Sequence, residues 1–221
     1  MKAGHPVLFV GAWPGDPELI TLKGQKALAQ ADVVLYTGSL VPQELLVYAR
    51  PGAELVDTAK LDLEAIVGRL VEAHRAGRRA VRLHTGDPSL YSTIHEQMVL
   101  FQEAQVPYRV IPGVTAGAAA AATLGKELTV PEVTQTVMYT RAAGRTPVPA
   151  AESLKNLAVH GATLVIYLSV HLVDEVVAQL LPHYGPQAPV AVVYRASWPD
   201  EQVVRGELGS IAGKVREAGI R

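Results

Sequence analysis

The sequence contains no cysteine, and this absence excludes several kinds of chemistry at once. A chain of 221 residues without thiols has no disulfide framework, no cysteine-ligated metal site and no thiolate nucleophile. Charge is scarce as well, since 19% of the residues are Asp, Glu, Lys or Arg and the net charge is −1. A protein that holds the phosphate backbone of a nucleic acid is normally basic, so a nucleic acid is not an expected partner.

Long apolar runs are also absent. No run approaches the roughly 18 residues that are needed to span a membrane. The apolar run that starts at Val7 stops at PGD (residues 14–16), which is too early for the core of a signal peptide, and no small-residue cleavage site is present there. We therefore expect a cytoplasmic protein without a membrane partner.

Several familiar site motifs are missing. The glycines of residues 11–17 (GAWPGDP) do not match the dinucleotide fingerprint, and the sequence has no Walker loop and no G-x-S-x-G nucleophile elbow. None of the seven histidines has a second histidine four residues away, the spacing of a helical metal site. The sequence therefore predicts no metal site in the protein itself.

The chain does contain an alternation of short β-branched runs with amphipathic helical patterns, which predicts an α/β fold. Because parallel strands need crossover connections, residues 1–113 are expected to form a first domain, a mostly parallel sheet with helices on both faces. The predicted strands are 7–10, 33–36, 54–58, 80–84 and 108–111, and the predicted helices are 21–31, 43–49, 61–76 and 93–105.

Residues 114–221 are expected to form a second α/β domain with a mixed sheet. Its last two strands follow each other closely, which favours antiparallel pairing. The small apolar segment 114–124 is either a tightly packed helix or the place where the two domains meet. The predicted strands are 136–139, 164–168, 190–194 and 202–207, and the predicted helices are 151–158, 172–181 and 211–218.

Three loops that directly follow predicted strands could carry a ligand: residues 11–17, 85–91 (TGDPSLY) and 112–117 (PGVTAG). In open α/β sheets, ligands bind beyond the C-terminal ends of the strands, so the loops together predict one adenosine-like or polar ligand. Asp87 would accept hydrogen bonds from its hydroxyl or ammonium groups. Taken singly, each loop is equally explained as an ordinary turn. In the first loop, Asp16 would then cap the helix that follows.

Aromatic residues make up only 5% of the chain, yet several stand at or just after the ends of predicted strands. Such positions suit stacking on a flat ligand and equally suit the packing of loops, so both interpretations stay open. The residues concerned are Trp13, Tyr91, Tyr139, Tyr194 and Trp198.

These loops and the motifs of the second half together resemble the tetrapyrrole (class III) methyltransferases. The family motifs are PGDP at 14–17, HTGDP at 84–88, PGVT at 112–115 and ELTVP at 127–131. Further motifs are similar to the members that methylate C11 of precorrin-4 or cobalt-precorrin-4 in cobalamin biosynthesis: TQTV at 134–137, TRA at 140–142 with GRTPVP at 144–149, and ASWPDE at 196–201. The expected activity is therefore that C-methylation, with S-adenosylmethionine as the methyl donor.

The resemblance implies that S-adenosylmethionine binds in a cleft between the two domains and leaves as S-adenosylhomocysteine, and that the protein is a homodimer. Trp13 stands where the family has the second glycine of its first loop, and we expect its indole to form one wall of the cleft mouth. Transferred residue by residue, the cofactor contacts fall on Pro14, Gly86, Asp87, Leu90, Thr115, Ala116, Leu168 and Ala196.

The implied substrate is an anionic tetrapyrrole, whose rim carboxylates call for fixed cations. Arg141 and Arg145 are the first candidates, followed by His84 and Arg195. Any cobalt would belong to the macrocycle, and no residue is assigned as a general base. Two alternatives stay open: another tetrapyrrole methyltransferase of the same superfamily, and a non-catalytic sensor of a small ligand on this fold.

Overall fold

The computed structural model describes residues 4–38, 47–144 and 146–220, and it divides into two compact units. The N-terminal unit consists of Met1–Ala119 with Ser197–Pro199, and the C-terminal unit of Ala120–Ala196 with Asp200–Arg221. The division falls inside helix α4 (Ala116–Leu124), whereas the sequence predicts a domain boundary after residue 113. Of the predicted helix 43–49, residues 43–46 lie outside the described ranges.

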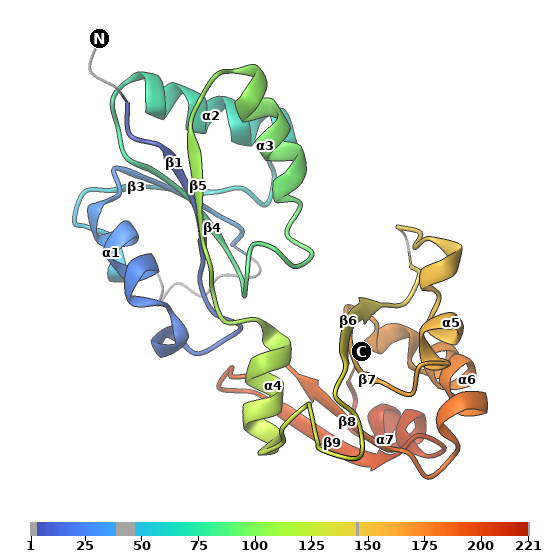
Figure 1. Cartoon of the computed structure of the whole chain (residues 1–221). Helices are drawn as coiled ribbons and strands as arrows, with labels where there is room; N and C mark the ends of the chain where they lie inside the picture. Colours follow the sequence, from blue (N-terminus) through green and yellow to red (C-terminus); the bar gives the residue numbers. More distant parts are fainter. Residues whose placement is uncertain (1–3, 39–46, 145, 221) are drawn as a thin grey trace. The chain divides into compact units, whose positions relative to one another are not determined.

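The N-terminal unit is built on a five-stranded sheet in the order β3-β2-β4-β1-β5, and all of its pairings are parallel, as predicted (Figure 1). The strands are β1 (Val7–Gly11), β2 (Val33–Tyr36), β3 (Glu54–Asp57), β4 (Ala80–His84) and β5 (Tyr108–Ile111). The connecting helices are η1 (Pro17–Leu19), α1 (Leu22–Gln30), α2 (Leu63–Arg75) and α3 (Ile94–Glu103).

Alternate residues of each strand supply two separate cores, because successive side chains of a strand point to opposite faces of the sheet. Phe9 of β1 packs with Leu70 of α2 and Phe101 of α3 on one face. Val10, the next residue of β1, packs with Leu28 of α1 on the other face. Figure 1 shows α2 and α3 together on one side of the sheet and α1 on the other.

Short polar side chains set where the helices of this unit begin. Thr21 accepts a hydrogen bond from the backbone N–H of Gly24 at 3.1 Å and caps α1. Asp62 does the same for α2 through Ala65 at 2.8 Å. Asp16 caps the short helix η1, which the sequence pattern does not predict, through the N–H of Glu18 at 2.9 Å, while Thr21 caps the predicted helix that follows.

The C-terminal unit contains two two-stranded sheets. β6 (Val137–Arg141) and β7 (Thr163–Tyr167) pair in parallel, and β8 (Pro189–Tyr194) and β9 (Gln202–Glu207) pair antiparallel, so the predicted antiparallel pair is present. The remaining helices are η3 (Ala150–Glu152), α5 (Leu154–Ala158), η4 (Val170–Leu172), α6 (Val173–Tyr184) and α7 (Ile211–Glu217). Within the described part of the chain, no helix has the length and apolar character to cross a membrane.

Candidate functional site

The loops that follow β1, β4 and β5 are hydrogen-bonded to one another. The N–H of Ala12 donates to the carbonyl of His84 at 2.8 Å, and the N–H of Gly86 donates to the carbonyl of Trp13 at 3.0 Å. The N–H of Gly113 donates to Oδ2 of Asp87 at 3.0 Å. Residues 12–16, 85–93 and 112–115 thus form one assembly at the C-terminal edge of the parallel sheet, which we term the loop cluster.

Three glycines let these loops approach at backbone distance. A Cβ atom added to Gly11 would lie 2.5 Å from the nitrogen of Gly113 and 2.7 Å from the carbonyl oxygen of Gly86, which is too close for any side chain. Gly86 also has a φ of +63°, a conformation that glycine adopts without strain. A ligand at this place would therefore meet main-chain N–H and C=O groups.

A distant segment, residues 197–199 of the N-terminal unit, is attached to the first of these loops. Ser197 Oγ accepts a hydrogen bond from the N–H of Asp16 at 2.9 Å, and Trp198 Nε1 donates to the carbonyl of Pro14 at 2.5 Å. A Cβ on Gly15 would lie 2.5 Å from the backbone nitrogen of Trp198. The ASWPDE motif therefore serves in part to brace the PGDP turn.

Asp87 organises the loop cluster through both carboxylate oxygens. Oδ1 accepts hydrogen bonds from the N–H of Ser89, at 2.8 Å, and from its hydroxyl, and Oδ2 accepts the one from Gly113. Burial alone would raise the pKa of Asp87, but these hydrogen bonds outweigh it and hold the pKa below its usual value. A carboxylate has about four acceptor positions, so little capacity is left for a ligand.

The residues expected to contact the cofactor divide between the two units. Pro14, Gly86, Asp87 and Leu90 lie in the loop cluster, and Thr115 and Ala116 lie at the start of α4. In the C-terminal unit, Leu168 directly follows β7 with a φ of +55° and is 70% exposed, while Ala196 follows β8 and is buried. The structure brings the first six together within the N-terminal unit.

Trp13 does not form a wall of a cleft mouth, and that expectation is wrong. Its side chain is 1% exposed and packs in the core on the α1 face with Leu28, Val34 and Leu83. The bulky residue beside Pro14 turns inward because burying an indole is more favourable than exposing it.

His84 is not a cation, which corrects its assignment as a partner for substrate carboxylates by charge. The side chain is 7% exposed, and burial together with the nearby charge of Arg82 lowers the pKa of His84 from 6.5 to about 3. At neutral pH the imidazole is uncharged. Its Nε2 atom is buried without a hydrogen-bond partner among the described residues.

The three arginines expected to bind the substrate carboxylates differ in the partners that the structure gives them. Arg141, at the end of β6, donates to the carbonyls of Thr146 and Pro147, both at 2.9 Å, so its guanidinium holds the loop that follows it. Arg195 forms an ion pair with Asp200 at 2.9 Å. Arg145 lies outside the described residues.

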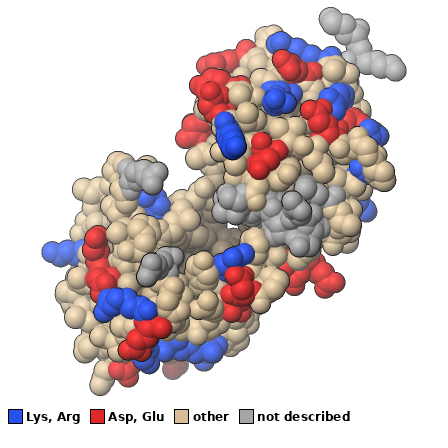
Figure 2. Space-filling view, turned by 180° about the vertical axis from the view of Figure 1, so that it is seen from behind, with Lys and Arg blue, Asp and Glu red and all other residues tan. Residues whose placement is uncertain are grey.

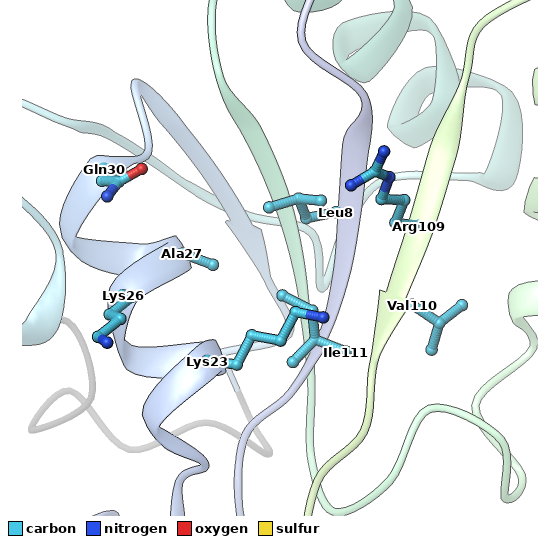
Figure 3. Close-up of a pocket in the computed structure, with 8 residues that line it drawn as sticks. All are labelled: Leu8, Lys23, Lys26, Ala27, Gln30, Arg109, Val110 and Ile111. Carbon is cyan, nitrogen blue, oxygen red and sulfur yellow. The ribbon is translucent and has the colours of Figure 1, made fainter.

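A pocket of about 480 Å³ lies between α1 and the edge strand β5, away from the loop cluster. Lys23 extends from α1 toward Ile111, whereas Lys26 points away from the strands (Figure 3). Arg109 stands on β5 itself. A cationic side chain on an edge strand discourages pairing with other chains, which is a sufficient role for Arg109.

The surface charges of the two units are mixed in sign. On the face drawn in Figure 2, Lys and Arg side chains are interspersed with Asp and Glu. In the described part of the chain, no group of three or more His, Asp or Glu side chains is arranged to hold a metal ion.

Comparison with known proteins identifies the family. Residues 6–212 match the family described as tetrapyrrole (corrin/porphyrin) methylases. The chain is 55% identical to the precorrin-4 C(11)-methyltransferase of Pseudomonas aeruginosa, over 97% of this chain and 86% of that protein. A solved structure of a cobalamin biosynthetic enzyme, cobalt precorrin-4 methyltransferase, superposes with a TM-score of 0.94 at 48% identity, over 97% of this chain and 90% of that one.

A more distant solved structure carries a ligand. It is the uroporphyrin-III C-methyl transferase of Thermus thermophilus complexed with S-adenyl homocysteine, with a TM-score of 0.78 and 32% identity, over 96% of this chain and 92% of that one. The matched motifs, the parallel sheet with its loop cluster and the near-complete coverage agree, and the chain belongs to the tetrapyrrole methylase family.

Proposed function

We propose that this protein is an S-adenosylmethionine-dependent C-methyltransferase that methylates C11 of precorrin-4 or cobalt-precorrin-4 in cobalamin biosynthesis. The observation that carries the proposal is the 55% identity to a precorrin-4 C(11)-methyltransferase over 97% of the chain. The solved cobalt precorrin-4 methyltransferase supports it nearly as strongly, at 48% identity. Relatives of both kinds are thus similar to this chain, and the proposal covers the metal-free and the cobalt-containing substrate.

The loop cluster offers groups that suit S-adenosylmethionine. The loops there are built of main-chain atoms, because Gly11 and Gly113 leave no room for a side chain and Gly86 has a positive φ, and Thr115 adds a hydroxyl just before α4. Bound there, the cofactor supplies a methyl group that its sulfonium already activates. The residues proposed to hold it are Pro14, Gly86, Asp87, Leu90, Thr115, Ala116, Leu168 and Ala196.

The role of Asp87 follows from the charge change during the reaction. The positive charge on sulfur disappears in the transition state, so a carboxylate in contact with it would stabilise the ground state more and slow transfer. The carboxylate of Asp87 is instead directed to Ser89 and Gly113. Asp87 is therefore a positioning residue that holds two loops in register for the cofactor.

The proposed substrate carries several carboxylates, and Arg141, Arg145 and Arg195 are the proposed cations for its rim. The hydrogen bonds from Arg141 to Thr146 and Pro147 fix the guanidinium, so it can contribute a positioned charge as well as hold its loop.

The family resemblance also supports a cytoplasmic homodimer. Light scattering of the purified protein tests the dimeric state.

The deciding experiment supplies methyl-¹³C-labelled S-adenosylmethionine with enzymatically prepared precorrin-4 and, in parallel, cobalt-precorrin-4. We expect one labelled methyl group per macrocycle, located at C11 by NMR. A labelled methyl at another ring position would indicate a different tetrapyrrole methyltransferase. Cofactor binding without any transfer to either substrate would indicate the sensor alternative.

A further inference from the structure

A buried cation stands in the middle of β4. Arg82 is 6% exposed, and its neighbours in the adjacent strands are Phe9 of β1 and Leu35 of β2, both fully buried. Because alternate residues of a strand share a face, Arg82 and His84 lie on the same side of the sheet. An arginine in such surroundings is rare unless it is paired.

Among the described residues, Arg82 has polar neighbours and no acidic partner. Its Nη1 donates to Thr58 Oγ1 at 3.1 Å and its Nη2 to Thr37 Oγ1 at 3.4 Å. The hydroxyl of Thr58 in turn donates to the carbonyl of Tyr36 at 3.0 Å, and this bond fixes the orientation of the Thr58 hydroxyl. In the described part of the chain, no carboxylate forms an ion pair with Arg82, and its Nε is buried without an acceptor.

No carboxylate of the described residues therefore compensates the charge of Arg82. Burial lowers the pKa of Arg82 to about 10, so the guanidinium still carries its proton at neutral pH. A guanidinium has five N–H donors, and the described residues accept hydrogen bonds from two of them. A buried, unpaired charge destabilises a protein, so the site is suited to an anion that arrives from outside.

A second buried polar atom belongs to the same face of the sheet. His84 Nε2 is buried without a hydrogen-bond partner among the described residues, and the ring of His84 lies 5.8 Å from the ring of Phe9, centroid to centroid. Arg82, His84, Thr37, Tyr91, Ser92 and Thr93 are among the residues that line a cavity of about 160 Å³. A water molecule takes up about 30 Å³ in the liquid, so the cavity has room for a short side chain and not for a macrocycle.

We propose that this cavity, the Arg82 pocket, binds one carboxylate of the tetrapyrrole, on an acetate or propionate side chain, through the Nε of Arg82 and the Nε2 of His84. The proposal rests on the proposed function, because only the identity of the substrate supplies that side chain. The cofactor's own amino-acid carboxylate is the other possible source. None of the residues proposed to hold the cofactor lines this pocket in the described part of the chain, which favours the substrate.

The first test uses Arg82→Gln, with Arg109→Gln as the matched control on the exposed edge strand β5. We expect Arg82→Gln to lower kcat/KM for the tetrapyrrole about 10- to 100-fold, the loss typical of a charge-assisted hydrogen bond, mainly through KM. Affinity for S-adenosylhomocysteine, measured by calorimetry, should stay within about twofold. Arg109→Gln should change neither quantity.

The second test needs no variant and no turnover. The Nε–Hε resonance of Arg82 in the ¹⁵N-labelled wild-type protein is followed by NMR during titration with propionate and, separately, with S-adenosylhomocysteine. Propionate should shift this resonance because Hε gains an acceptor. This measurement decides the matter even if Arg82→Gln fails to fold.

Three outcomes overturn the proposal. If the wild type transfers methyl groups while Arg82→Gln keeps its kcat/KM and propionate leaves Hε unmoved, the pocket is not a carboxylate site and the proposed function stands. If Arg82→Gln loses affinity for S-adenosylhomocysteine with an unchanged tetrapyrrole KM, the carboxylate belongs to the cofactor. If the wild type transfers no methyl group, the proposed function fails and the substrate assignment fails with it, and the propionate titration then reports on the pocket alone.

Discussion

Burial sets the protonation state of His84. In the unfolded chain the imidazole takes up a proton near its ordinary pKa of 6.5, whereas the folded protein resists protonation until about pH 3. Between these values the unfolded state binds more protons, so the contribution of His84 to stability is complete above pH 6.5 and is lost as the pH falls. The neighbouring charge of Arg82 adds to the effect of burial.

This predicts a pH-dependent difference between the wild type and His84→Asn. Lowering the pH from 7.5 to 5 should cost the wild type about 2 kcal/mol of unfolding free energy more than it costs the variant. Urea denaturation in carboxylate-free buffers measures this difference. His160→Asn, at an exposed position, should follow the wild type. Parallel curves for His84→Asn and the wild type would show that His84 titrates normally.

A second prediction at this scale concerns Trp13. Because its indole is 1% exposed in a packed core, Trp13→Ala should lower the unfolding free energy by about 3 to 5 kcal/mol. Trp13→Phe should cost less, since the indole N–H has no partner among the described residues. Leu22→Ala, at a side chain that is 74% exposed, is the control and should stay within about 0.5 kcal/mol. Urea midpoints decide between this role and a direct contact with substrate, for which Trp13→Ala would raise KM and leave stability unchanged.

At the scale of elements, the loop cluster depends on hydrogen bonds between segments that are far apart in the sequence. Asp87→Asn keeps the size of the side chain but replaces one acceptor oxygen with an N–H₂ group, which would face a donor. We expect faster amide exchange at Gly113 and about tenfold weaker binding of S-adenosylhomocysteine, since one half-buried hydrogen bond to a charged group is lost.

The two readouts together separate positioning from direct contact. Ser89→Ala is the control, because it removes one donor to Oδ1 and keeps the bond to Gly113. It should leave exchange at Gly113 near the wild-type rate. Weaker cofactor binding by Asp87→Asn with unchanged exchange at Gly113 would mean that Asp87 touches the cofactor itself.

The elements themselves follow closely from sequence patterns. The predicted strand 80–84 coincides with β4, and the predicted helix 61–76 contains α2 (Leu63–Arg75), because apolar periodicity and capping act locally. The family motifs at 14–17, 84–88 and 112–115 also fall in the loops that form the loop cluster. The direction in which an individual side chain points is harder to predict from the sequence, because it depends on packing across the sheet.

Arg82 and Trp13 illustrate that difference. A single arginine inside an apolar strand of a sheet that is covered on both faces is itself a signal of a special site, and Arg82 could have been found in that way. The lack of a counter-charge among the described residues could not be predicted, because the partners of Arg82, Thr37 and Thr58, come from the residues that directly follow β2 and β3. Trp13 is expected at a cleft mouth because a bulky side chain beside Pro14, at a family glycine position, would otherwise lie exposed or displace the loop, whereas the core on the α1 face has room for its indole.

At the scale of the whole molecule, a net charge of −1 and the mixed charges in Figure 2 provide little long-range attraction for a polyanionic substrate. Recognition must then come from a few local cations. Exposed cations are screened by salt, since the Debye length is about 10 Å at 0.1 M and 3 Å at 1 M, whereas buried ones are screened much less. Arg141, which is half-buried, and the buried Arg82 should therefore respond differently to ionic strength.

This difference predicts two patterns when kcat/KM for the tetrapyrrole is measured from low to high salt. Arg141→Gln should flatten the salt dependence relative to the wild type, because the screened contact is gone. Arg82→Gln should lower kcat/KM at every salt concentration and leave the slope unchanged, because the contact it removes is buried. Arg109→Gln serves as the control for a change of one surface charge and should keep both the value and the slope. If Arg82→Gln instead flattens the slope as Arg141→Gln does, substrate reaches Arg82 through water, and the pocket is not a closed carboxylate site.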